Sequence, residues 1–153
     1  MNVKKIIEHC KKTKCETLSL KNMNLKKLPH SIKNLDHLRF LYLENNDLSE
    51  FPKDICTLKN LEILDLENNE RILDIPSCIK NLKKLGELTM FKTGVSSLPK
   101  EIDELKNLDF MPMYENYKEY GNSDNICKMY VNNKAIRPFL RYEKDITDPG
   151  YGK

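Results

Sequence analysis

Aromatic and acidic residues recur along this chain at a spacing that suits them to bind another protein. Tyr42 is followed 23 residues later by Asp65, Glu44 is followed 23 residues later by Glu67, and Phe40 lies two positions before Tyr42. Aromatic anchors within a charged surround are typical of protein–protein interfaces. A fold that places these segments side by side would therefore present one surface to the basic and apolar side chains of a partner.

Residue types that carry catalysis or bind metals do not gather into a recognisable motif. The three histidines have no nucleophile and acid arranged with them as a catalytic triad requires. The terminal segment Gly150–Lys153 lacks the upstream glycine and the following Ser or Thr of a phosphate-binding loop. Cys127 lies in a C-terminal segment that is too short to fold as a catalytic cysteine domain. We therefore predict no enzyme activity, no cofactor and no metal site.

The cysteines show no paired spacing. They stand at Cys10, Cys15, Cys56, Cys78 and Cys127, without a Cys-x-x-Cys pair, which argues against a zinc site. The N-terminal segment has no apolar run that could act as a signal sequence, and no segment is long enough to span a membrane. These features predict a cytoplasmic, reducing environment and no membrane partner.

The elements that would position the recognition residues come from a repeat of about 23 residues. Copies start at Cys15, Leu38, Leu61 and Leu85, and a partial fifth copy starts at Leu108. Each copy reads L-x-x-L-x-L-x-x-N-x-L-x-x-L-P-x-x-I-x-x-L. The alternating leucines have the period of a short strand with one buried face. Such strands bury that face only when they stack, so the repeats predict a parallel sheet over a leucine core.

The other positions of the repeat predict how the chain turns and returns. A buried Asn after the strand, as at Asn46 and Asn69, can satisfy backbone donors and acceptors in the turn. Met23 and Thr93 take its place in the first and fourth copies, so we expect the row of amides to be interrupted there. The L-P-x-x-I-x-x-L half has the spacing of a short helical or 3₁₀ segment. One extra residue within 69–76 predicts a bulge that leaves the stack intact.

Two further features concern the ends and the charged surface. Val3, Ile6, Ile7 and Cys10 have helical spacing, which predicts an amphipathic cap helix over the first repeat. The chain carries 26 Lys and Arg against 23 Asp and Glu, a net charge of +3, which is too balanced to favour nucleic-acid binding. Lysines are frequent on the helical side, but acidic residues lie among them. We interpret that side as an ordinary solvated surface.

This repeat resembles the leucine-rich repeat family, and its L-P-x-x-I-x-x-L half is similar to the intracellular subclass of Ras-associated scaffolds and related plant and amoebal proteins. The resemblance implies an α/β solenoid: a short leucine-rich-repeat arc with a parallel β-sheet on the concave face, short helical or 3₁₀ segments on the convex face and an N-terminal cap helix. We expect a cap over residues 1–14, repeats over 15–116, and a C-terminal cap or tail over 117–153.

The resemblance implies a non-catalytic interaction module, such as a signalling adaptor, regulator or effector. Positions between the strand leucines should align in columns about 5 Å apart on the concave face. The candidate partner-binding residues there are Phe40, Tyr42, Glu44, Ile63, Asp65, Glu67, Glu87, Thr89, Phe91, Phe110 and Tyr114. The alternative for the aromatics is that they simply favour strands. We expect a monomer that binds a protein or peptide with basic and apolar side chains.

A second functional class stays open. The protein could instead be a structural subunit of a larger assembly, docked through the C-terminal tail from Tyr117 to Lys153. That tail is rich in aromatic residues but has little periodicity. It could serve as a cap on the last repeat or as an arm that orders on binding.

Overall fold

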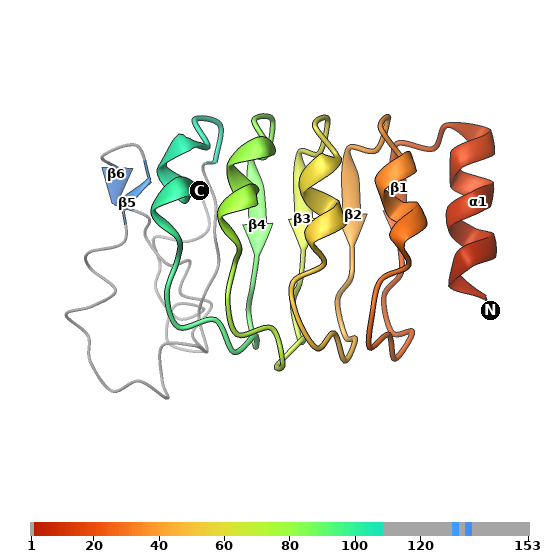
Figure 1. Ribbon diagram of the computed structural model, residues 1–153, viewed down its shortest axis with the longest axis horizontal. Coiled ribbons are helices and arrows are strands. Elements are labelled where there is room, and N and C mark those ends of the chain that lie inside the picture. Colours follow the sequence, from red (N-terminus) through yellow and green to blue (C-terminus); the bar gives the residue numbers. More distant parts are fainter. Residues whose placement is uncertain (1, 109–129, 132–133, 136–153) are drawn as a thin grey trace, which may run out of the picture.

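The structure, a computed structural model, describes residues 2–108, 130–131 and 134–135. Helix α1 (Val3–Thr13) is followed by units that each hold a strand and a 3₁₀-helix, stacked in a row (Figure 1). The strands are β1 (Thr17–Ser19), β2 (Phe40–Tyr42), β3 (Ile63–Asp65) and β4 (Glu87–Thr89). The 3₁₀-helices are η1 (His30–Asn34), η2 (Lys53–Thr57), η3 (Ser77–Asn81) and η4 (Lys100–Glu104). Two later strands, β5 (Tyr130–Val131) and β6 (Lys134–Ala135), pair antiparallel.

Strands β1 to β4 form a parallel sheet in chain order, with the register that the repeats predict. Thr17 pairs with Phe40, Phe40 with Ile63, and Ile63 with Glu87. Residues two positions later align in the same way. The predicted columns are thus confirmed from β1 to β4. The face of this sheet that points away from the 3₁₀-helices is called the concave face below.

The core lies between the sheet and the row of 3₁₀-helices. Leu18, Leu41, Leu64 and Leu88 are at most 3% exposed, and Ile55 at the centre of η2 is fully buried. Each fully buried leucine contributes roughly 1.5–3 kcal/mol relative to an exposed one. Because each repeat covers the apolar side of the next, this stabilisation depends on the stack as a whole. The predicted fold class, a short leucine-rich-repeat arc, is confirmed.

The asparagine row works across repeats. The Asn46 amide nitrogen donates to the carbonyl oxygens of Leu43 at 2.7 Å and of Leu20, one repeat earlier, at 2.9 Å. Its oxygen accepts from the backbone nitrogens of Met23 at 3.1 Å and Leu25 at 3.0 Å. The predicted interruption at Met23 therefore does not leave these two nitrogens without an acceptor, because the second repeat supplies the amide for the first.

The next rows follow the same plan. Asn69 is fully buried, donates to the carbonyls of Leu43 and Leu66, and accepts from the Leu48 nitrogen. Thr93 donates to the Met90 carbonyl at 2.8 Å. The residue before each of these positions has a positive φ: Asn22, Asn45, Asn68 and Lys92. Asn tolerates this left-handed conformation better than most residues, so the Asn-Asn pairs divide two tasks, turning the chain and bonding its backbone.

Each 3₁₀-helix begins directly after a proline of the repeat. Pro29, Pro52, Pro76 and Pro99 occupy the N-cap positions with φ between −60° and −73°. A proline there loses no hydrogen bond, because its missing N–H would have no partner in the helix. The predicted short helical segments are confirmed as 3₁₀-helices.

The extra residue of the third repeat changes the loop and not the stack. Ile72 and Ile75 remain buried, whereas Leu73 is 67% exposed. The enlarged loop lies close to Gly94, where an added Cβ would stand 2.6 Å from the Leu73 side chain and 2.7 Å from the Glu70 carbonyl oxygen. A glycine is therefore required at position 94 by packing.

Helix α1 covers the first repeat as predicted. Ile7 and Cys10 are buried, and Val3 and Ile6 pack partly buried against the core. The Asn2 side chain accepts from the Lys4 nitrogen at the start of the helix. An N-cap of this kind satisfies a backbone donor that the helix itself cannot.

Four of the cysteines form disulfides, which their spacing in the sequence did not predict. Cys10 is disulfide-bonded to Cys15 and Cys56 to Cys78, with Cα–Cα distances of 5.0 and 5.8 Å, well within the range of disulfides. Neither pair could be recognised from the spacing of the cysteines in the sequence. The left-handed Lys14 ends α1 and turns the chain back on itself, and stacking brings together residues that are one repeat apart.

The C-terminal predictions fall largely on residues that the structure does not describe. Phe110 and Tyr114, the end of the repeats at residue 116 and most of the segment 117–153 lie outside the described residues. These assignments stay predictions.

Candidate functional site

The side chains on the concave face are small and polar on β1. From β2 to β4 they are larger and include aromatic, aliphatic and acidic residues. Thr17 and Ser19 on β1 are exposed. The half-buried predicted site residues on this face are Phe40, Tyr42, Glu44, Ile63, Glu67, Glu87, Thr89 and Phe91. Asp65 differs from the expectation of a solvent-facing carboxylate, because it is only 9% exposed. The sheet therefore brings together the predicted residues that lie within the described part of the chain.

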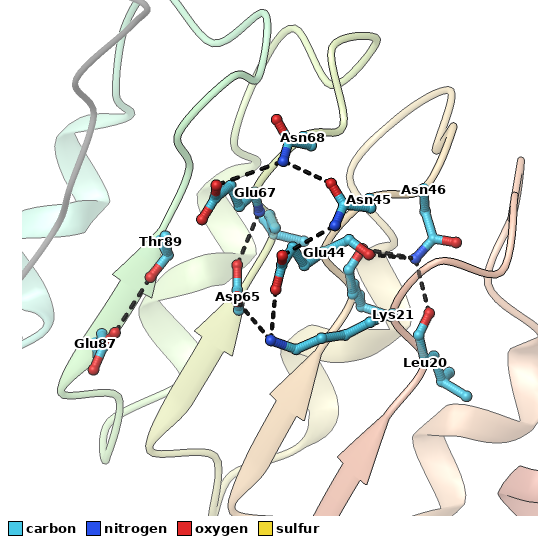
Figure 2. A network of polar contacts seen from close by, with 12 residues as sticks. Leu20, Lys21, Glu44, Asn45, Asn46, Asp65, Glu67, Asn68, Glu87 and Thr89 are labelled. Carbon is cyan, nitrogen blue, oxygen red and sulfur yellow. Dashed lines mark hydrogen bonds and ion pairs between the residues drawn. The ribbon is translucent and has the colours of Figure 1, made fainter.

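Lys21 enters this surface from the first repeat. Figure 2 shows its ammonium group between the carboxylates of Glu44 and Asp65. The Lys21 nitrogen lies 2.5 Å from Glu44 Oε2, 3.9 Å from Asp65 Oδ2 and 4.8 Å from the centre of the Tyr42 ring. One side chain of the protein thus already occupies an acidic and aromatic setting that suits a cation.

The acidic groups outnumber the cations that neutralise them. Within the described residues, no ion pair is formed by Glu67 or Glu87. Asp65 accepts a hydrogen bond from the Glu67 backbone nitrogen at 3.0 Å, and Glu87 accepts one from the Thr89 hydroxyl at 3.3 Å. Lys21 and Lys92 lie near Glu67 and lower its pKa, but the carboxylates of this face still outnumber these two cations.

The pKa values of these groups reflect the same excess of carboxylates over cations. Burial raises the pKa of Asp65, and the carboxylates of Glu44 and Glu87 raise it further. Burial and the nearby Asp65 carboxylate raise the pKa of Glu67. The hydrogen bond to Glu44 raises the pKa of Lys21. Desolvation and like charges both disfavour an ionised carboxylate, so a cation that binds here would relieve an unfavourable charge arrangement.

Amide side chains hold one border of the acidic group. Asn68 Nδ2 donates to Asn45 Oδ1 at 2.6 Å, and Asn45 Nδ2 donates to Glu44 Oε1 at 3.0 Å (Figure 2). Both asparagines are the left-handed residues of their turns. The turns that end the strands therefore also orient the acidic side chains.

A second charged row runs along the other end of the strands. Arg39 donates through Nε and Nη2 to both oxygens of Glu62, at 2.8 and 3.0 Å, and through Nη1 to Glu16 at 2.9 Å. The bidentate contact to Arg39 lowers the pKa of the Glu62 carboxyl. The position equivalent to Glu16, Arg39 and Glu62 in the fourth repeat is Gly86. Among the described residues, the row stops there, at a position that has no side chain.

Two residues of this surface are not among the predicted partner-binding residues. Lys21 stands in the column of Glu44 and Glu67, so a search for opposite charges at the repeat spacing would have found it. Gly86 gives no such signal, because a glycine before a strand is most often read as a weak strand position.

The described part of the chain holds neither a metal-binding cluster nor a helix that could span a membrane. No group of three or more His, Cys, Asp or Glu residues there could hold a metal ion. Among the helices of residues 2–108, none is long and apolar enough to cross a membrane.

Comparison with known proteins gives the chain its relatives. Residues 8–133 match the family model of a leucine-rich repeat region. A leucine-rich repeat protein of Leptospira interrogans is 34% identical over 67% of this chain and 27% of its own, with a TM-score of 0.57. The ectodomain of the receptor kinase SOBIR1 from Arabidopsis thaliana is 27% identical over 63% of this chain and 55% of its own, with a TM-score of 0.53. The chain thus spans about a quarter and about half of these two proteins. No curated protein matches it.

Proposed function

The chain belongs to the leucine-rich repeat family, whose domains are in general protein–protein interaction modules and typically non-catalytic, and from this we propose that it binds a protein partner through the concave face. The partner segment would present lysine or arginine together with apolar side chains. In this role the protein acts as an adaptor, regulator or effector without an enzymatic activity of its own.

The single observation that supports this function best is an acidic group with more carboxylates than nearby cations, beside aromatic side chains. Asp65 is nearly buried and has a raised pKa, yet the one described cation within 4 Å is Lys21, which it shares with Glu44. A sheet surface built for stability alone would not gain from a buried carboxylate with so little neutralisation. A guest ammonium or guanidinium group would supply the missing charge, and Tyr42 and Phe40 would pack against its neighbours.

The experiment is a selection of random linear peptides on the immobilised protein, followed by affinity measurement with the wild type and with Tyr42→Ala/Glu67→Lys. We expect selected peptides to be enriched in Lys or Arg beside apolar residues. The double variant should lose their binding, because it removes an aromatic anchor and reverses a charge at the site.

The matched control is Glu50→Lys, which makes the same charge change at an exposed position in the loop before η2. It should bind the selected peptides as the wild type does. Equal binding by all three proteins, with the fold intact by circular dichroism, would remove the concave face as the site.

The structural-subunit alternative makes a different prediction. If the tail from Tyr117 to Lys153 docks the protein in an assembly, removing it should abolish co-purification with the other subunits, while Tyr42→Ala/Glu67→Lys should leave it unchanged. Limited proteolysis complements this test. Rapid trimming to about residue 121 with the repeats intact would favour a binding arm, and resistance would favour a cap.

The cysteine pairs change the basis on which the compartment was predicted. The expectation of a reducing cytoplasm rested in part on unpaired cysteines, whereas disulfides are typical of oxidising compartments. The test is to alkylate the protein in its source cells before lysis and count the blocked thiols by mass spectrometry. Cys10, Cys15, Cys56 and Cys78 labelled as free thiols would support a reducing compartment. If all four are protected, the protein works in an oxidising one.

A further inference from the structure

Gly86 is not explained by the folding of the repeat. An added Cβ at this position would lie 3.5 Å from the Asn107 carbonyl oxygen and 3.8 Å from that of Glu62, which are ordinary van der Waals contacts. Its φ lies outside the left-handed region that favours glycine. The contrast is Gly94, where a Cβ would collide with neighbours below 3 Å. Packing therefore requires the glycine at 94 and not the glycine at 86.

What Gly86 does is leave a space on the concave face. In the preceding repeats this position carries Glu62, Arg39 and Glu16, whose side chains form the charged row described above. Where the row stops, an open hollow of about 500 Å³ remains at the start of β3 and β4. The residues lining it are Phe40, Glu62, Ile63, Lys84, Gly86, Glu87 and Asn107.

The lining of this hollow combines apolar side chains with charged ones. Phe40 and Ile63 supply the half-buried apolar surface. Glu62 is already held by Arg39, and Lys84 donates to the Asn60 side chain at 2.7 Å. Glu87 is the carboxylate of the hollow that makes no ion pair with a described residue. The hollow thus suits an apolar side chain with a positive charge close by.

The spacing along the strands fixes how far away that charge should be. Ile63 and Asp65 are two residues apart on one strand, as are Glu87 and Thr89 on the next. Residues two apart on a strand lie on the same face, about 6.8 Å from each other. An extended partner segment has the same period, so a residue in the hollow and the residue two positions away both face the sheet.

We propose that the hollow at Gly86 receives an apolar side chain of the partner, and that a lysine or arginine separated from it by one residue binds the carboxylates of Asp65 and Glu67. This proposal rests on the function proposed above and adds its recognition pattern. The occupant is an extended segment of another protein, chosen because its charge complements the acidic group and its period matches the strands.

The test uses two synthetic peptides of equal composition on a serine-glycine background. In the first, leucine and arginine are separated by one residue; in the second they are adjacent, so that an extended chain directs them to opposite sides. We expect the wild type to bind the first peptide at least about tenfold more tightly, which corresponds to burial of one apolar side chain. Equal affinities for the two peptides would overturn the proposed spacing between the apolar and the basic residue.

Variants at position 86 then test the hollow itself. Gly86→Leu places an apolar side chain in the hollow where the partner residue would bind, and it should weaken binding of the spaced peptide about tenfold or more. Gly86→Ala adds only a Cβ and should weaken binding less. Gly86→Ala should keep the melting temperature of the wild type, because the added Cβ meets no close neighbour. Gly86→Leu should keep it as well, because its longer side chain extends into the open hollow. An unchanged affinity in Gly86→Leu would overturn the proposal.

The outcomes separate this inference from the proposed function. If Gly86→Leu binds normally while Tyr42→Ala/Glu67→Lys does not, the proposed role of the hollow is wrong, and the proposal of a binding site on the concave face stands. If neither variant changes binding, both fail. Self-association of the wild type that Gly86→Leu abolishes, measured by sedimentation, would assign the hollow to a second copy of this chain and would also overturn the proposal.

Discussion

The two faces of the four-stranded sheet follow different rules. On the inner face the same residue types return in every repeat, and the strand leucines are almost fully buried. On the concave face the types change from repeat to repeat: Thr17, Phe40, Ile63 and Glu87 form one column. The inner face must fit its own neighbours in the stack, whereas the concave face is half-exposed and free to suit a partner.

Under the proposed function, this difference assigns stability and recognition to adjacent residues. Side chains at successive positions of a strand point to opposite faces, so Ile63 and Leu64 have different tasks although they are neighbours in the chain. The predictions that follow compare such neighbouring positions, beginning with the largest expected effect.

The sharpest comparison is Leu64→Ala against Ile63→Ala. Leu64 is fully buried at the centre of the stack, so its truncation should lower the free energy of unfolding by about 3 kcal/mol. Ile63 is half-buried on the concave face and its truncation should cost less than about 1 kcal/mol. Urea denaturation measures both. Similar losses would mean that the concave face is part of the core.

The second comparison uses two consecutive asparagines. Asn69→Ala leaves buried backbone groups of Leu43, Leu48 and Leu66 short of a partner, and should cost about 2 kcal/mol. Asn68→Gly keeps the left-handed turn at φ 53°, because glycine adopts it freely, and should change stability little. Thermal or urea unfolding of the two variants tests the division of tasks. A larger loss in Asn68→Gly would contradict it.

The third comparison is between Lys21, a cation of the protein itself, and the arginine of a bound peptide. Lys21→Met removes the ammonium group from Glu44 and Asp65 while keeping much of the apolar stem. Because a partly exposed ion pair contributes little, we expect stability close to that of the wild type. Affinity for arginine-containing peptides should rise a few-fold, since Lys21 no longer competes for the carboxylates. Isothermal titration calorimetry measures this, and a weaker affinity would show that Lys21 helps to form the site.

The smallest effect is a pH dependence of opposite sign for two carboxylates. Burial raises the pKa of Asp65 above its ordinary value of 3.8, so the folded state holds that proton more strongly than the unfolded chain. Stability from this group is present below pH 3.8 and is lost as the pH rises through the raised pKa. Asp65→Asn should therefore flatten the fall in stability over that window, and at neutral pH it should be at least as stable as the wild type.

The control for that pH dependence is Glu62. Arg39 lowers the pKa of Glu62 below 4.5, so its contribution is present above pH 4.5 and is lost as the pH falls through the lowered pKa. Glu62→Gln should remove a stability loss on the acid side. Urea midpoints measured from pH 3 to pH 7, roughly the range over which carboxylates titrate, test both variants. A change of the same sign in both would contradict the assignment.

Much of the scaffold could be predicted from the repeat, because these features depend on residues close together in the sequence and on the repeat period. The burial of Leu41 and Leu43 follows from strand alternation, the start of η2 follows from Pro52, and the column from Thr17 to Glu87 follows from the 23-residue period. The disulfide between Cys56 and Cys78 could not be predicted, because these cysteines stand at different positions of their repeats. Phe110 and Tyr114 remain predictions, since they lie outside the described residues.

The sequence alone therefore determined which side of each strand is buried and which residues share a column, because both depend on periods along one chain. It also placed the acidic and aromatic residues on a common face. The tertiary structure decided how those residues treat one another: Asp65 is buried, Lys21 reaches across two repeats, and Gly86 opens a hollow. These properties depend on the reach and packing of side chains from several repeats at once, which no single repeat encodes.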